Sequence, residues 1–404
     1  MARRFAAWRD LDPRIGRLAT ARAVNTLGLS LVMSFLGIYI IDDRGYSATL
    51  YGVLALAANL GQSYANAWAG ELSDRIGRRP LIVGSLLVRS VVIAILGAQI
   101  LLDASLPALA ATFILSSTLR GCFDPVAYAL CTDLARPEQR TAAFGLQRMG
   151  TNVGWALGPA LGGLLSRVVP YGAVFFVAAA GMIGAAWLCR GIDVAPVARR
   201  DLARVSLRAA LREAAGQPAL RLLLIATVVF AIAHTQMFTL FTVYLADELR
   251  LSKFEIGLCY MVNGALVLTL QWWALGVIAK VGIARILPLA ALVLAAGYLL
   301  VGAAVGVASA MLAIAVITLG EVAFAPAHQT AAADSGDAAR LGKSFGLVAL
   351  AQTVGIAFAP LCGGALFDHL RGQHLALWSC VAATCVVLAG LLVAYGRRRA
   401  AAVA

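Results

Sequence analysis

The chain has 404 residues, 61% of them hydrophobic and only 13% charged, and its mean hydropathy is +0.85. Soluble domains carry about 45–50% apolar and about 25% charged residues, so the composition excludes a soluble globular protein and indicates a polytopic membrane protein. The net charge of +13 would suit a nucleic-acid ligand, but the distribution of the charges along the chain argues against that partner.

Residues 1–18 are basic and lack both an apolar core and a small-residue cleavage site, so we interpret them as a cytoplasmic lead-in and not as a secretory signal. Apolar runs of nearly membrane-spanning length then recur along the rest of the chain. The twelve expected spans are 18–41, 49–70, 81–102, 106–132, 140–166, 171–190, 219–246, 255–279, 286–304, 309–331, 343–366 and 374–396.

Most of the 33 Lys and Arg residues fall in the loops and termini of one side, and Arg22 is counted there with the N-terminal group. Cytoplasmic loops carry such an excess of basic residues, so we expect an inner-membrane protein with both termini in the cytoplasm. The basic residues expected outside the cytoplasm are Arg44, Arg167, Arg250, Lys253 and Arg371, and those expected within spans are Arg89, Arg120 and Arg148.

Segment 191–217 separates the sixth and seventh spans, and its arginines alternate with leucines and valines. This pattern favours either an amphipathic helix on the anionic inner leaflet or a solvated linker. Either form divides the chain into a domain at 1–190, a cytoplasmic linker at 191–217 and a domain at 218–404.

The two halves repeat one another. A shift of 201 residues superimposes Asp133, Phe144, Gly154, Pro159 and Gly163 on Asp334, Phe345, Gly355, Pro360 and Gly364, and a shift of 205 superimposes Gly52 and Gly77 on Gly257 and Gly282. Six spans separate the copies, so both halves have the same topology, which is typical of a parallel repeat about an axis along the membrane normal. The expected fold is an all-α membrane protein of about twelve transmembrane helices in two six-helix bundles.

The loop between the second and third spans, Gly70 to Pro80, reads GELSDRIGRRP and is densely charged. Asp74 and Arg78 are four residues apart, close enough to pair on a helix. The string resembles the loop 2–3 signature of the major facilitator superfamily, G-x-L-[SA]-D-R-x-G-R-[RK], at each defined position.

That resemblance implies a charge cluster that latches the two halves on the cytoplasmic side. Arg78 would pair with Asp133 at the end of the fourth span, and Asp74 would face the N-terminal end of the eleventh span. The alternative is that the loop only folds and orients the chain. The expected latch residues are Asp74, Arg75, Gly77, Arg78, Arg79 and Asp133.

The fifth span contains a second motif, whose glycines four residues apart form a flat face for close helix contact. Its residues are Gly154, Gly158, Pro159, Gly162 and Gly163, and Pro159 is expected to bend the helix. The string resembles the antiporter signature found in the fifth span of facilitator exporters, which implies export, although tight packing alone would also require these glycines.

Two carboxylates, Asp124 in the fourth span and Glu321 in the tenth, lie at membrane depth, where charges are costly and mark candidate functional sites. Arg120 lies one turn before Asp124, so the two can pair along one helix face, and Arg120 is also the repeat equivalent of Glu321. In the facilitator fold spans one, four, seven and ten line the central cavity, so an Arg120–Glu321 contact that breaks as the halves rock would change the proton affinity of Glu321. We favour Glu321 as the proton carrier, with Asp124 second and static ion pairs as the alternative.

His234 in the seventh span is either a further titrating group or a structural hydrogen-bonding residue. The other expected cavity residues are polar or aromatic side chains that also commonly bond between helices. They are Asn25, Arg148, Asn152, Gln236 and Phe238.

The resemblance covers nearly the whole chain and is closest to the twelve-span drug:proton antiporters. It implies efflux of hydrophobic or amphipathic small molecules, driven by proton entry through alternating access. That group often has an acid in the first span, where this chain has only Asn25. The alternative is an exporter of a specific metabolite or lipid-like molecule, proton-coupled or not.

We expect neither an enzyme nor a passive channel, because no HExxH, GxSxG or metal-ligand spacing is present and a channel needs no latch. The seven cysteines are odd in number and lie mostly in apolar runs, so we expect neither disulfides nor metal. The expected partners are small-molecule substrate, protons and membrane lipid, with no cofactor, and the chain is expected to be a monomer.

Overall fold

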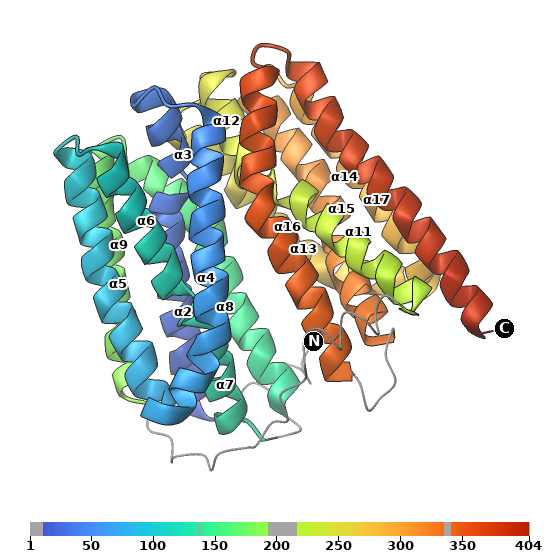
Figure 1. Ribbon diagram of the computed structural model, residues 1–404, viewed down its shortest axis with the longest axis horizontal. Coiled ribbons are helices and arrows are strands. Elements are labelled where there is room, and N and C mark those ends of the chain that lie inside the picture. Colours follow the sequence, from blue (N-terminus) through green and yellow to red (C-terminus); the bar gives the residue numbers. More distant parts are fainter. Residues whose placement is uncertain (1–10, 137–138, 193–215, 335–340, 404) are drawn as a thin grey trace. The chain divides into compact units, whose positions relative to one another are not determined.

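The computed structural model describes residues 11–136, 139–192, 216–334 and 341–403, so most of the expected linker lies outside the described residues. Regular structure in these ranges consists only of helices, as the apolar composition predicts (Figure 1). In the first half they are α2 (Pro13–Met33), α3 (Leu36–Ile38), the π-helix η1 (Tyr39–Asp43), α4 (Ala48–Ile76), α5 (Arg78–Leu101), α6 (Leu106–Arg120), α7 (Asp124–Leu134), α8 (Arg140–Leu165) and α9 (Tyr171–Arg190). In the second half they are α11 (Pro218–Thr235), α12 (Leu240–Asp247), α13 (Lys253–Val281), α14 (Ile283–Gly302), α15 (Val307–Asp334), α16 (Leu341–His369) and α17 (His374–Val403).

Each of the twelve expected spans coincides with one helix or with a broken series of helices. Among the described residues, 10 segments are both long and apolar enough to cross a membrane. The two remaining expected spans, α4 and α8, are 29 and 26 residues long but carry more polar side chains. The fold is therefore an all-α membrane fold, and the polar side chains of α4 and α8 need neighbouring helices to shield them from lipid.

Three expected spans are broken, which the sequence reasoning did not predict. The first is interrupted between α2 and α3 and ends in the π-helix η1, and the seventh is interrupted between α11 and α12. The fourth is interrupted at Gly121–Phe123, where the backbone N–H groups bond to carbonyls three residues back at 3.0–3.1 Å. Pro125 lies two residues further on and has no N–H to continue the helical ladder, which favours a break between α6 and α7.

The chain forms two compact units that follow packing and not chain order. The first comprises Met1–Leu36, Ala57–Asp201 and Ser252–Gly264, and the second comprises Gly37–Leu56, Leu202–Leu251 and Ala265–Ala404. Helices α4 and α13 are thus each divided between the units. The expected domains at 1–190 and 218–404 stay a prediction, because these units do not coincide with the two halves of the sequence.

Helix packing within each unit reproduces the repeat in the sequence. In the first unit α2 packs against α8 and α9, and α5 packs against α9 and α6. In the second unit α11 packs against α16 and α17, and α14 packs against α17 and α15. These are the same pairs of spans, six spans apart, so the shared residues of the two halves support the same bundle twice.

Candidate functional site

The α4–α5 loop holds the charge cluster that the sequence predicts. Arg78 makes an ion pair through Nε with Asp133 of α7, donates to Ser73 Oγ at 3.0 Å and lies 3.2 Å from Asp74 Oδ1. The Arg78 and Asp133 side chains are only 21% and 14% exposed, so this pair is shielded from water. The expected Arg78–Asp133 contact is present, whereas its role as a latch, and the approach of Asp74 to the eleventh span, stay predictions.

The other loop residues have simpler surroundings. Arg75 bonds to Glu71 at 2.6 Å on the exposed surface of α4, and Arg79 is half-buried. Gly77 precedes α5 with φ 96° and ψ 148°, and its repeat equivalent Gly282 precedes α14 with φ 81° and ψ 151°. Only glycine adopts this conformation readily, which explains why both halves have glycine here.

Asp124 pairs with Arg22 of α2. The sequence reasoning expected it to pair with Arg120, and that expectation was wrong. The Arg22 Nη1 to Asp124 Oδ1 distance is 2.7 Å. Arg120 ends α6 and Asp124 begins α7, so the break between them removes the continuous helix turn that would have placed the two on one face. Arg22, which the sequence reasoning assigned to the cytoplasm, is a buried intramembrane residue with only 3% of its side chain exposed.

Arg22 is the centre of a polar network inside the first unit. Its Nε donates to Gln147 Oε1 at 3.1 Å, and Gln147 Nε2 donates to the Ile15 carbonyl at 3.2 Å. The guanidinium also lies 4.4 Å from the Tyr128 ring centroid. One turn along α2, Asn25 Oδ1 accepts from Arg89 Nη1 at 3.4 Å. The expected cavity residue Asn25 is therefore a buried partner of Arg89.

In the second unit, the structure brings two predicted proton-coupling residues together. His234 Nε2 of α11 lies 3.5 Å from Glu321 Oε1 of α15, and both side chains are 21% exposed. The His234 ring stacks on Phe230 at 5.1 Å, and Phe230 stacks on Phe324 at 3.9 Å. This aromatic column fixes the imidazole next to the carboxylate. Arg120 belongs to the first unit, so its expected contact with Glu321 stays a prediction.

The remaining expected cavity residues differ in their surroundings. Gln236 is 3% exposed, and its Nε2 donates to the Ala359 carbonyl at 2.8 Å, so it joins the α11–α12 break to α16, and its expected role in a cavity stays a prediction. Phe238 makes an edge contact with His234 at 5.6 Å. Asn152 is half-buried and Arg148 is exposed on α8.

The glycines of the α8 motif mediate close helix packing. A Cβ atom at Gly154 would lie 2.7 Å from Thr26 Cβ, and one at Gly162 would lie 2.1 Å from the Leu31 carbonyl oxygen. The place of Gly158 is similar, because a Cβ there would lie 1.8 Å from Ser30 Oγ. Ser30 Oγ also donates to the Gly154 carbonyl at 2.8 Å. The motif packs α8 on α2, with Pro159 inside the helix and Gly163 against the start of α13.

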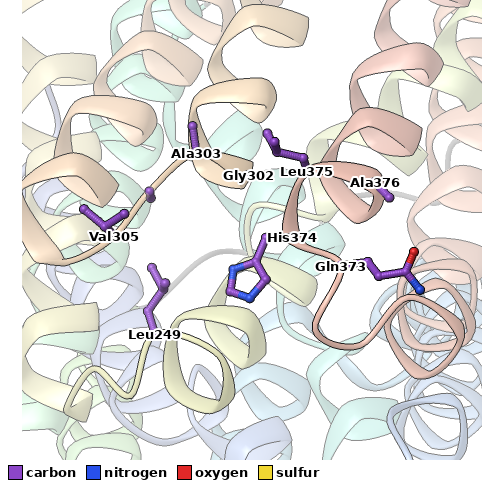
Figure 2. A pocket seen from close by; sticks show the side chains of 9 residues that line it. Leu249, Gly302, Ala303, Val305, Gln373, His374, Leu375 and Ala376 are labelled. Carbon is purple, nitrogen blue, oxygen red and sulfur yellow. The ribbon is translucent and has the colours of Figure 1, made fainter.

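The second unit has a surface pocket of about 690 Å³ where α12 and α14 end and α17 begins, and its lining includes none of the charged residues just described. Figure 2 shows His374 and the polar Gln373 among mostly apolar lining residues. The His374 ring bonds through Nδ1 to Tyr244 Oη at 2.9 Å and lies 3.2 Å from Glu248 through Nε2, so both ring nitrogens have partners within the protein.

Sequence reasoning missed Arg22 and did not assign a partner to Arg89. A signal for both was present, because Arg22 lies inside the expected span 18–41 and three residues before Asn25, on the same face of a helix. An arginine within an apolar span is costly unless it meets an acid or another polar group. Applying that rule to Arg22 would have pointed to an intramembrane partner such as Asp124.

Comparisons with known proteins agree with this architecture. A sequence model of the Major Facilitator Superfamily matches residues 18–320. The multidrug resistance protein MdtH of Aeromonas salmonicida is 28% identical over 375 residues, which cover 89% of this chain and 89% of that protein. MdtH of Salmonella typhi is 26% identical over 360 residues, covering 87% of this chain and 85% of that protein.

Solved structures with the same fold are also found. A POT family transporter crystallised in complex with 5-aminolevulinic acid has a TM-score of 0.74 at 13% identity, covering 95% of this chain and 96% of that chain. A bacterial homologue of the human lysosomal transporter Spinster, in an inward-facing and unoccupied conformation, has a TM-score of 0.71 at 16% identity, again covering 95% and 96%. At these identities the structural likenesses show the fold alone.

Proposed function

Because the chain belongs to the major facilitator superfamily, we propose that it is a secondary active transporter that exports hydrophobic or amphipathic small molecules by alternating access. The curated relatives are named multidrug resistance proteins and align over nearly their whole length, which supports efflux. The excess of basic residues on one side supports a bacterial inner-membrane location with both termini in the cytoplasm. The chain acts as a monomer.

The observation that carries proton coupling is the contact between Glu321 and His234 at membrane depth. Both groups can bind a proton, and a carboxylate next to an imidazole exists in two charge states that differ by one proton. Entry of a proton neutralises the carboxylate or charges the imidazole, and each change alters the strength of the pair. A transport cycle that opens the pair to one side and then the other would move this proton across the membrane.

Asp124 is the second candidate, and its surroundings argue for a different role. Arg22 is almost completely buried and lies 2.7 Å away, so the two opposite charges balance one another inside the first unit. The partner of Asp124 is a permanent cation, whereas Glu321 lies next to a histidine, a residue type whose charge changes on protonation. We therefore assign proton carriage to Glu321 and charge balance in the first unit to Asp124.

The Arg78–Asp133 pair serves as the cytoplasmic latch in this proposal. The pair joins the α4–α5 loop to the end of α7, and Asp74 is 57% exposed beside it. Because Asp74 is exposed, its carboxylate can bind a further cation or a helix N-terminus on the cytoplasmic side. Opening and closing of that side would make and break this additional contact.

Proteoliposomes test the proposal. Substrate-dependent pH change in the lumen is recorded with cationic, neutral and lipid-like compounds, for the wild type, Glu321→Gln and His234→Gln. We expect coupling in the wild type, its loss in Glu321→Gln and a fall of about tenfold or more in His234→Gln. The matched control is Glu255→Gln, which removes an acid from the first turn of α13.

Two results would contradict parts of this proposal. Unchanged coupling in Glu321→Gln would reduce Glu321 to a structural partner of His234 and make Asp124 the carrier. Absence of proton movement with every compound would contradict proton-coupled drug efflux and favour uncoupled export of a specific metabolite or lipid-like molecule.

A further inference from the structure

The first unit contains more buried positive charge than its carboxylates compensate. Arg22 and Arg89 have 3% and 1% of their surface exposed, and Arg120 is half-buried at the end of α6. Arg89 lies within electrostatic range of both Arg120 and Asp124. We call these three residues the arginine cluster. Among the carboxylates of the described residues, Asp124 alone lies within ion-pair distance of one of these arginines.

Several N–H groups of the cluster lack hydrogen-bond acceptors. Arg22 Nη2, Arg89 Nε and Arg89 Nη2 are buried and have no partner among the described residues. The other guanidinium nitrogens donate hydrogen bonds. Arg22 Nη1 donates to Asp124 and Arg22 Nε donates to Gln147, while Arg89 Nη1 donates to Asn25. The guanidinium groups are thus held in place by neighbours while their remaining donors are free for a further acceptor.

This arrangement is energetically unfavourable without an additional anion. A buried donor with no partner costs about 1–3 kcal/mol, and an uncompensated buried charge costs more. Neutralising one guanidinium is not an alternative, because arginine keeps its proton in proteins. A carboxylate, sulfonate or phosphate group would supply both the negative charge and the acceptor oxygens, and guanidinium donors match these groups in geometry.

The rim of the cluster is accessible and partly aromatic. The side chain of Asp124 is 40% exposed although its partner Arg22 is buried. Tyr128 is also 40% exposed, and its ring lies 4.4 Å from the Arg22 guanidinium. A ligand that approaches past these two residues meets an aromatic surface first and the guanidinium groups behind it. That order suits a molecule with an apolar body and one acidic group.

We propose that the arginine cluster is a binding site for the oxyanion of an amphipathic organic acid, with Tyr128 against the apolar body. The anion accepts hydrogen bonds from the free donors of Arg22 and Arg89, and Arg120 adds positive charge within electrostatic range of Arg89. This assignment names a substrate class for the transporter proposed above. Binding of the acid does not depend on that proposed function, whereas its movement across the membrane rests on it. The same donors would accept a free inorganic anion, so the test separates the two sources.

The test measures binding to the full-length protein in nanodiscs of zwitterionic lipid at constant ionic strength. Three probes share one apolar body: 1-naphthalenesulfonate, the neutral 1-naphthamide and the cationic 1-naphthylmethylammonium. Chloride and inorganic phosphate are added as competitors. Each probe is titrated against the wild type, Arg89→Gln, Arg120→Gln and the control Arg190→Gln, which removes an exposed arginine at the end of α9 in the same unit.

We expect the sulfonate to bind more tightly than its neutral and cationic counterparts. Loss of a charge-assisted hydrogen bond should weaken sulfonate binding roughly 10- to 100-fold in Arg89→Gln. Arg120→Gln should weaken it less, and Arg190→Gln should leave it unchanged. If Arg89→Gln does not fold, as judged by its thermal unfolding, Arg120→Gln decides, because Arg120 is half-buried and has no ion pair to lose in the described part of the chain.

The outcomes are separable. Competition by chloride or phosphate that is lost in the arginine variants supports the anion site and assigns a free anion as its occupant. Equal sulfonate affinity in the wild type and both variants, or tighter binding of the ammonium probe, overturns the proposal. Arginine-dependent sulfonate binding without any proton movement in proteoliposomes would leave the binding site standing while the proposed transport cycle fails.

Discussion

Gly77 shows how a single residue can be required by backbone geometry before any charge is considered. It lies between the last residue of α4 and the first of α5 at φ 96° and ψ 148°, in a region that L-residues almost never occupy. Its neighbour Arg78 begins α5 and reaches Asp133, so the glycine sets the direction in which the arginine leaves the turn. The loop motif therefore combines a conformational requirement with an electrostatic one.

Gly77→Ala should destabilise the protein by about 1–3 kcal/mol, because a Cβ strains this conformation regardless of the space available. The measurement is thermal unfolding of the purified protein in detergent. Gly70→Ala is the matched control, since Gly70 lies inside α4 and a Cβ there meets nothing within 4 Å. Its midpoint should stay the same or rise, and an equal loss in both variants would contradict the backbone explanation.

At the scale of helices, the α8 motif acts through contact and not through chemistry. Gly154, Gly158 and Gly162 recur at four-residue intervals and face α2 at distances that leave no room for a side chain. The same helix carries Gln147, which bonds to Arg22. Close packing of α8 on α2 thus also fixes the geometry of the polar network inside the first unit.

Gly162→Ala should therefore destabilise the first unit and disturb that network. The added Cβ would lie 2.1 Å from the Leu31 carbonyl oxygen, a backbone atom that cannot rotate away, so the helices must separate. Overpacking of this kind costs about 1–3 kcal/mol. Thermal unfolding measures this loss of stability. Gly145→Ala on the same helix should show no loss, because a Cβ added there meets nothing within 4 Å.

At the scale of the whole molecule, α4 and α13 are each shared between the two compact units. A Cβ at Gly364 of α16 would lie 2.1 Å from the Ala48 carbonyl, and one at its repeat equivalent Gly163 of α8 would lie 2.3 Å from the Lys253 carbonyl. The start of α4 is also capped from α16, because Asp368 accepts from Ala48 N at 3.0 Å and Thr49 N at 2.8 Å. Helices from different halves of the sequence are thus joined twice.

Asp368→Ala should loosen the start of α4 alone. Loss of a helix cap costs about 1 kcal/mol, which corresponds to an approximately fivefold faster amide exchange for the N–H groups of Ala48 and Thr49. Hydrogen exchange with peptide-level resolution on the full chain measures this change. The first turn of α13 serves as an internal reference, because Ser252 and Glu255 cap it locally. Equal acceleration at both helices would indicate general destabilisation and contradict the capping role.

Composition and periodicity were enough to predict the membrane class, the spans and the internal repeat, whereas the Arg78–Asp133 pair was implied by the resemblance of the α4–α5 loop to a family signature. The first three follow from composition and from apolar runs of bilayer length, which are local or periodic properties of the chain. Arg78 and Asp133 lie 55 residues apart, and only the family resemblance linked them. Gly77 belongs with these local properties because its positive φ is a backbone constraint, whereas the α8 glycines are required by close contact with α2.

The charge pairs inside the membrane became known from the packing of the helices. Asp124 pairs with Arg22 and not with Arg120 because the helix breaks between Arg120 and Asp124. Glu321 lies next to His234 because α11 and α15 bring these side chains together. The burial of Asn25 and Gln236 also came from helix packing. Pairings across helices depend on where helices break and how they rotate, and neither property is fixed by the spacing of residues within one span.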